Sequence, residues 1–80
     1  MKEKFKRIIC NRIKFLLEES NLTAEALAYQ SGVSKGGMSE ILNCKKFPSL
    51  FTIAKICSGL NISLETFCAD KDIREIVEQL

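Results

Sequence analysis

The sequence predicts an all-α fold, on the basis of three observations. Apolar residues recur at three- and four-residue steps along most of the 80-residue chain, which is the spacing of one face of a helix. Residues that cap helices, among them Thr23, Ser34 and Ser49, stand directly before these apolar stripes. No segment alternates apolar and polar residues as a half-buried strand would. We therefore expect residues 1–80 to form a single small domain of short amphipathic helices.

The first three helices follow from these patterns. The first is expected over about residues 4–19, the second over 23–31 and the third over 34–43. Gly32 can adopt the positive φ that ends the second helix, and the turn that follows is so short that the third helix must cross the second steeply. The stretch 23–43 therefore has the signature of a helix-turn-helix, a motif that places its second helix in the major groove of DNA.

A fourth helix is expected after Pro48, with Ser49 as its cap. Its buried side is expected to hold Leu50, Ile53, Ala54, Cys57 and Leu60. Asn61 is expected to end this helix in a left-handed conformation, and Asn21 to end the first helix.

Two short helices are expected to complete the chain. Ser63 can cap a fifth helix that carries Leu64, Phe67 and Cys68. Asp70 or Asp72 can start a C-terminal helix over about residues 71–80. The apolar stripe of this last helix consists of Ile73, Ile76, Val77 and Leu80.

Composition and charge narrow the class of protein. With 46% hydrophobic and 28% charged residues, the chain is neither disordered nor a linker. The net charge is +2, but residues 1–46 carry nine basic and five acidic residues, whereas residues 47–80 carry three and five. This asymmetry suits a protein with one face toward a polyanion, although a solvated basic face would give the same pattern. There is no histidine, no nucleophile with a matching base and no phosphate-binding glycine loop, so we expect neither an enzyme nor a cofactor.

The cysteines do not form a metal-binding motif. Cys10, Cys44, Cys57 and Cys68 are separated by 34, 13 and 11 positions, without a CxxC pair. We therefore expect no metal site, and free thiols that mostly lie within apolar helical patterns. No signal-peptide pattern and no apolar run of membrane length is found. These features favour a cytoplasmic protein that does not associate with membranes.

Residues 12–68 resemble the phage Cro/cI-like (XRE-type) helix-turn-helix family over its five-helix domain. The matching motifs are Ala-x-x-x-Gly-Val-Ser at 28–34, Pro-Ser-Leu at 48–50 and Leu-Asn-Ile-Ser-Leu at 60–64, where the family usually has Gly in place of Asn61. The resemblance implies a compact five-helix lambda-repressor-like fold, here with a short additional C-terminal helix. It also implies a transcriptional regulator, of repressor or controller type, that binds a double-stranded DNA operator as a homodimer.

Several positions depart from the family pattern. Many members carry Arg at the position of Leu17 and Glu at that of Leu42, which form an ion pair; because both are leucine here, we expect a contact between them. The family often has Gln at the position of Ala24, where only backbone N–H groups remain to hold a phosphate. Gly36 and Gly37 either loosen the start of the third helix or let its backbone approach DNA closely. The residues Ala24, Gly36 and Gly37 motivate an alternative function, a protein-interaction module or antitoxin-like partner protein with weakened DNA binding.

The exposed side of the third helix is expected to contact bases. The residues concerned are Lys35, Gly36, Ser39 and Glu40. Lys35 can reach the O6 and N7 acceptors of guanine, and Glu40 can accept from the amino group of cytosine. The alternative role of Lys35 is that of an ordinary solvated charge.

A second set of residues is expected to hold the phosphate backbone. It consists of Thr23, Ala24, Ser34, Gly37, Asn43, Lys45 and Lys46. Contacts of this kind position a protein without reading sequence, and they make binding depend on salt. The alternative role of Lys45 and Lys46 is to keep their loop soluble.

Apolar residues of the second half of the chain are candidates for a dimer interface. The set comprises Phe51, Phe67, Ile73, Ile76, Val77 and Leu80. Phe51 can form a partner-binding patch with Phe47, although a single exposed aromatic residue needs no role. The C-terminal stripe can instead dock on Phe5, Ile8 and Ile9 of its own chain.

Overall fold

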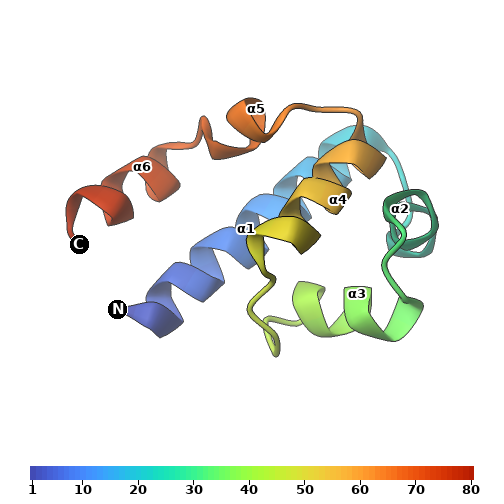
Figure 1. Ribbon diagram of the computed structural model, residues 1–80, viewed down its shortest axis with the longest axis horizontal. Helices are drawn as coiled ribbons and strands as arrows, with labels where there is room; N and C mark the ends of the chain where they lie inside the picture. Colours follow the sequence, from blue (N-terminus) through green and yellow to red (C-terminus); the bar gives the residue numbers. More distant parts are fainter.

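The computed structural model describes residues 1–80, which form six helices and no strand. They are α1 (Lys2–Ser20), α2 (Ala24–Ser31), α3 (Lys35–Leu42), α4 (Leu50–Leu60), α5 (Leu64–Cys68) and α6 (Lys71–Glu78). Figure 1 shows the long α1 with α4 beside it, α2 and the start of α3 at one end of the molecule, and α6 at the other end. The predicted all-α fold is confirmed.

Each helix from α2 to α6 begins at a side-chain cap. The hydroxyls of Thr23, Ser34, Ser49 and Ser63 and the carboxylate of Asp70 each accept a backbone N–H three residues later, at 2.9–3.1 Å. Each cap satisfies an N–H group that has no partner within its helix, and is typically worth about 1 kcal/mol. The predicted helix starts are confirmed, and of the two aspartates considered for α6 the cap is Asp70.

Left-handed residues end three of the helices. Asn21 (φ 60°), Gly32 (φ 68°) and Asn61 (φ 59°) follow α1, α2 and α4 respectively. Glycine and asparagine tolerate this conformation better than most residues, so the predicted ends are confirmed. Cys44, in the loop after α3, also has a positive φ of 60°, which no sequence pattern predicted.

The hydrophobic core draws on all six helices. It consists of Ile9, Ile13, Leu27, Ala28, Met38, Ile41, Ile53, Ile56, Cys57, Phe67 and Ile73. Leu17 and Leu42 are half-buried and pack against this core from α1 and α3, two helices that contact each other. A direct contact between the two leucines stays a prediction. Because Met38 and Ile41 are anchored in the core, the opposite face of α3 must point outward.

The predicted buried side of α4 was partly wrong. Leu50 is 66% exposed and Ala54 is also exposed, whereas Ile56, which the prediction omitted, is fully buried. Successive helical residues lie about 100° apart, so Ala54 points well away from Ile53. Leu50 stands in the first turn, at the edge of the buried stripe formed by Ile53, Ile56 and Cys57.

The short α5 also buries less than predicted. Phe67 is only 1% exposed, but Leu64 and Cys68 lie at the surface. A helix of five residues makes little more than one turn, so one large side chain fills its contact with the core.

The C-terminal stripe is divided between the core and the surface. Ile73 and Ile76 are buried where α6 packs on α1, while Val77 is 52% and Leu80 77% exposed. Docking on the chain's own first helix therefore accounts for the inner half of the stripe. Phe67, Ile73 and Ile76 are enclosed within their own chain, which leaves Phe51, Val77 and Leu80 as the exposed members of the predicted dimer interface.

Candidate nucleic-acid interface

A three-residue turn sets the angle between α2 and α3. Gly32 takes the left-handed conformation, and the Val33 N–H donates to the carbonyl of Ala28 at 3.0 Å, which closes the end of α2. Ser34 then caps α3 immediately. In Figure 1 α2 is seen nearly end-on while α3 lies across the view, so the two helices cross steeply, as the turn length predicted.

The outer face of α3 carries the four residues that were predicted to contact bases. Lys35, Gly36, Ser39 and Glu40 are all exposed, whereas Met38 and Ile41 of the same helix are buried. The structure therefore brings the predicted base-contacting residues together on one solvent-facing surface. Their contact with DNA stays a prediction.

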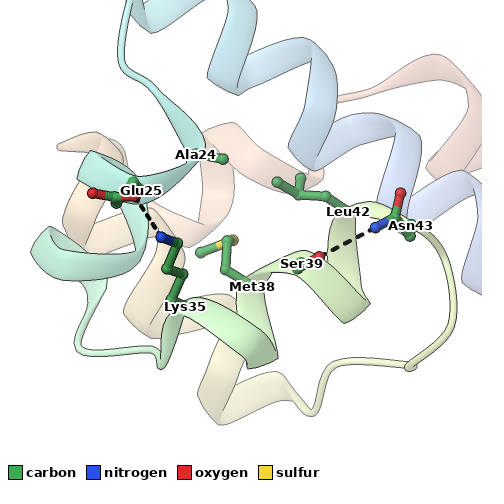
Figure 2. Close-up of a pocket in the computed structure, with 7 residues that line it drawn as sticks. All are labelled: Ala24, Glu25, Lys35, Met38, Ser39, Leu42 and Asn43. Carbon is green, nitrogen blue, oxygen red and sulfur yellow. Dashed lines mark hydrogen bonds and ion pairs between the residues drawn. The ribbon is translucent and has the colours of Figure 1, made fainter.

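The ammonium group of Lys35 is already engaged. Its Nζ lies 2.9 Å from Oε2 of Glu25, on the first turn of α2. Both side chains are largely exposed, at 80% for Lys35 and 72% for Glu25. Figure 2 shows the lysine reaching from the start of α3 across to α2. Glu25 was not among the predicted site residues, because the pairing depends on how the two helices cross.

A hollow of about 420 Å³ lies beside this ion pair, and we call it the α2–α3 hollow. It is lined by Ala24, Glu25, Lys35, Met38, Ser39, Leu42 and Asn43 (Figure 2). The Asn43 Nδ2 group donates to Oγ of Ser39 at 3.3 Å across one turn of α3. Two residues predicted to hold phosphate, Ala24 and Asn43, therefore border the same hollow as the predicted base-contacting Lys35 and Ser39.

The two glycines of α3 have different surroundings. A Cβ atom on Gly37 would lie 2.9 Å from Oγ of Ser34, the atom that accepts the Gly37 N–H. A Cβ atom on Gly36 would meet nothing within 4 Å. Gly37 therefore leaves room for the cap of α3, while Gly36 leaves an open stretch of backbone on the outer face.

A second hollow, of about 340 Å³, lies between the start of α3 and the start of α4, and we call it the α3–α4 hollow. Its polar lining includes Ser34, Lys46, Ser49, Thr52 and Lys55. The Lys55 ammonium lies 3.4 Å from the carbonyl of Gly32, in the turn before α3. Ser49, the cap of α4, and Thr52 and Lys55 within it recur at three-residue steps, a helical polar stripe in the sequence that points to Lys55.

The cations near α3 differ in their partners. Lys45, Lys46 and Lys55 form no ion pair, in contrast to Lys35. Lys45 is exposed and lines neither of the two hollows. Thr23 lies at the surface, where its hydroxyl caps α2. Unpaired cations beside the outer face of α3 are groups that attract a polyanion.

The two aromatic residues considered for a partner patch behave differently. Phe51 is 72% exposed, with the Lys55 ammonium 5.1 Å from its ring centre. Phe47 is half-buried and stacks on Phe5 of α1, with 5.9 Å between the ring centres. An apolar hollow of about 300 Å³ lies at this stack, lined by Met1, Lys2, Phe5, Phe47 and Leu80.

The cysteines remain free thiols, and no group of three or more metal-ligating side chains is found. None of the helices is long and apolar enough to cross a membrane.

Comparison with known proteins gives one match. The family model described as a Cro/C1-type HTH DNA-binding domain matches residues 12–72. No curated protein and no solved structure matches the chain.

Proposed function

The chain belongs to the Cro/C1-type helix-turn-helix family of DNA-binding regulators, which are not enzymes, and from this premise we propose that it binds one operator sequence through α3. In the proposed complex α3 lies in the major groove, with Lys35 directed at a guanine and Ser39 and Glu40 at neighbouring bases. The observation that carries the proposal is the shared outward direction of these side chains beside a turn that fixes α3 against α2.

Two clusters flank α3 and would hold the phosphate backbone. On one side lies the α2–α3 hollow, bordered by Ala24 and Asn43. On the other side lies the α3–α4 hollow, with Lys46 and Lys55. A duplex running along α3 would thus meet polar or basic groups on both flanks, and such contacts fix the register of a protein on DNA.

We further propose a homodimeric repressor or controller that acts in the cytoplasm. Two copies would place their α3 helices in successive major grooves, about 34 Å apart. The exposed outer residues Val77, Leu80 and Phe51 supply apolar surface for association. The four cysteines are free thiols, and thiols are kept reduced in the cytoplasm, which supports this proposed location.

A protein-interaction module is the second candidate function. The apolar hollow at Met1, Phe5, Phe47 and Leu80 supports it, because such a surface is suited to a protein rather than to DNA.

Selection from a random duplex library, followed by titration of the best duplex and a scrambled one at two salt concentrations, separates the two candidates. Operator binding predicts a strong preference for the selected duplex and weaker binding to both duplexes at the higher salt concentration. Equal affinity for both duplexes would favour the interaction module.

Lys35→Ala tests the proposed base contact. The variant is expected to lose about 1–3 kcal/mol on the selected duplex and to relax the preference at one base pair. Lys45→Ala is the matched control, since a phosphate contact weakens all sequences alike. Repeating the selection with each variant measures the preference, and an unchanged preference for Lys35→Ala would contradict the assignment.

A further inference from the structure

We propose that Glu25 is a specificity-determining residue that positions Lys35 and withholds its charge from duplexes of the wrong sequence. The inference rests on the proposed operator binding through α3. It concerns a residue on α2, outside the set of side chains expected to contact bases.

The geometry makes Glu25 the partner of the predicted base-reading lysine in the free protein. The Oε2 to Nζ distance is 2.9 Å, and the two residues belong to different helices of the motif. Gly36 and Gly37, which follow Lys35, have no side chains, so no other charge lies nearby in the first turn of α3. In the free protein the Lys35 side chain therefore points toward Glu25 (Figure 2).

Exposure makes this pair easy to open. With both side chains more than 70% exposed, water screens the attraction, and exposed ion pairs contribute little to folding stability. The Lys35 ammonium can thus shift toward a better partner at low cost without giving up Glu25 entirely. The O6 and N7 atoms of guanine in the major groove are such a partner, since they accept two hydrogen bonds from one ammonium group.

A duplex without that guanine offers Lys35 only phosphate oxygens or a single base acceptor such as adenine N7 or thymine O4, and these must compete with the carboxylate. While the pair persists, Lys35 displaces no counterion from the DNA, and non-specific binding has one cation fewer. If Lys35 does move to a phosphate, the carboxylate of Glu25 is left unpaired near a polyanion, which is unfavourable. On the operator, Lys35 can donate two N–H groups to guanine and keep the third on Glu25, so both effects weaken binding to the wrong sequence more than binding to the operator.

The experiment compares Glu25→Gln with the wild-type protein on the selected duplex and on the scrambled duplex. Glutamine keeps the size and removes the charge. Binding to the scrambled duplex is expected to tighten by about three- to tenfold at low salt, with a salt slope steeper by about one unit. Binding to the selected duplex is expected to change by less than about twofold, so the ratio of the two affinities falls.

Two controls isolate the pair. Glu75→Gln makes the same charge change on α6, at the opposite end of the molecule, where the residue is exposed and unpaired (Figure 1). It is expected to leave the affinity ratio unchanged. In a Lys35→Ala background, Glu25→Gln is expected to lose its effect on the ratio, because there is no lysine to release.

The inference is overturned if Glu25→Gln tightens both duplexes equally, or if its effect on the ratio persists without Lys35. Circular dichroism confirms that each variant is folded before binding is measured. A wild-type protein that prefers no duplex would contradict the proposed function itself, so the two failures are distinguishable.

Discussion

At the scale of single residues, the four cysteines lie in three different environments. Cys10 and Cys57 are buried, Cys44 is half-buried and Cys68 is exposed. Burial, with a further contribution from neighbouring Cys44, raises the pKa of the Cys10 thiol to about 11. Burial also raises the pKa of Cys57. Because the thiolate is the reactive form, the two buried cysteines are poor nucleophiles near neutral pH.

This contrast predicts how the thiols react in the native protein. With Ellman's reagent at about pH 8, Cys68 is expected to react first and Cys44 next, while Cys10 and Cys57 react only as the chain unfolds. Cys68→Ser removes the fast phase and serves as the assignment control. Four thiols reacting at one rate in the folded protein would contradict the buried positions of Cys10 and Cys57.

Residues with a purely local role were predictable from the sequence. Ser34 and Asn61 act through their own backbone neighbours, and their type and place before or after an apolar stripe were sufficient. Glu25 was not predictable, since its partner lies across a helix crossing whose geometry the sequence does not specify. The left-handed conformation of Cys44 was missed because cysteine gives no signal for it.

At the scale of helices, the contact between α2 and α4 depends on Gly59. A Cβ atom there would press on Oγ of Ser31 and lie 3.1 Å from its backbone nitrogen and 3.2 Å from its Cα. Ser31 is buried, and its hydroxyl has no hydrogen-bond partner. The close approach of the two helices therefore requires glycine at this position.

Gly59→Ala is expected to lower the free energy of unfolding by about 1–3 kcal/mol, because the added methyl group forces α4 away from α2. Gly36→Ala is the matched control, where open space and better helix propensity predict a gain of up to about 1 kcal/mol. Urea unfolding followed by circular dichroism measures both. If Gly59→Ala instead raised the free energy of unfolding, the requirement for glycine at the contact between α2 and α4 would be contradicted.

The helices themselves were more predictable than their orientation. Caps and left-handed residues mark where α2 and α4 begin and end, because these signals lie within a few residues of each boundary. Which side of α4 is buried depends on where α2 packs. This is why Leu50 was assigned to the core and Ile56 was omitted.

At the scale of the whole molecule, Arg12 ties the first helix to the segment that joins α5 and α6. Its Nε and Nη2 groups donate to the carbonyls of Phe67 and Thr66, both at 2.9 Å, at the end of α5. Its Nη1 lies 3.9 Å from the carboxylate of Asp70, the cap of α6. One side chain of α1 thus holds residues more than 50 positions away, a contact that no local pattern in the sequence could predict.

Arg12→Met retains most of the aliphatic bulk and removes these hydrogen bonds. Because the bonds come from a charged donor that is only 11% exposed, the expected loss in unfolding free energy is about 1.5–3 kcal/mol. Lys14→Met on the same helix is the control, since Lys14 is exposed and is expected to matter little. Equal urea midpoints for the two variants would contradict the role of Arg12.

Met1 and Leu80 border the same apolar hollow, and Figure 1 shows both ends of the chain at the end of the molecule away from α2 and the start of α3. A flexible linker from Leu80 of one copy to Met1 of another would join two recognition helices in one polypeptide. The connection would leave from the far side of each copy and keep the outer faces of both α3 helices open. Tethering converts the second docking step into an intramolecular one, so such a tandem protein would engage both half-sites at concentrations where separate copies remain apart.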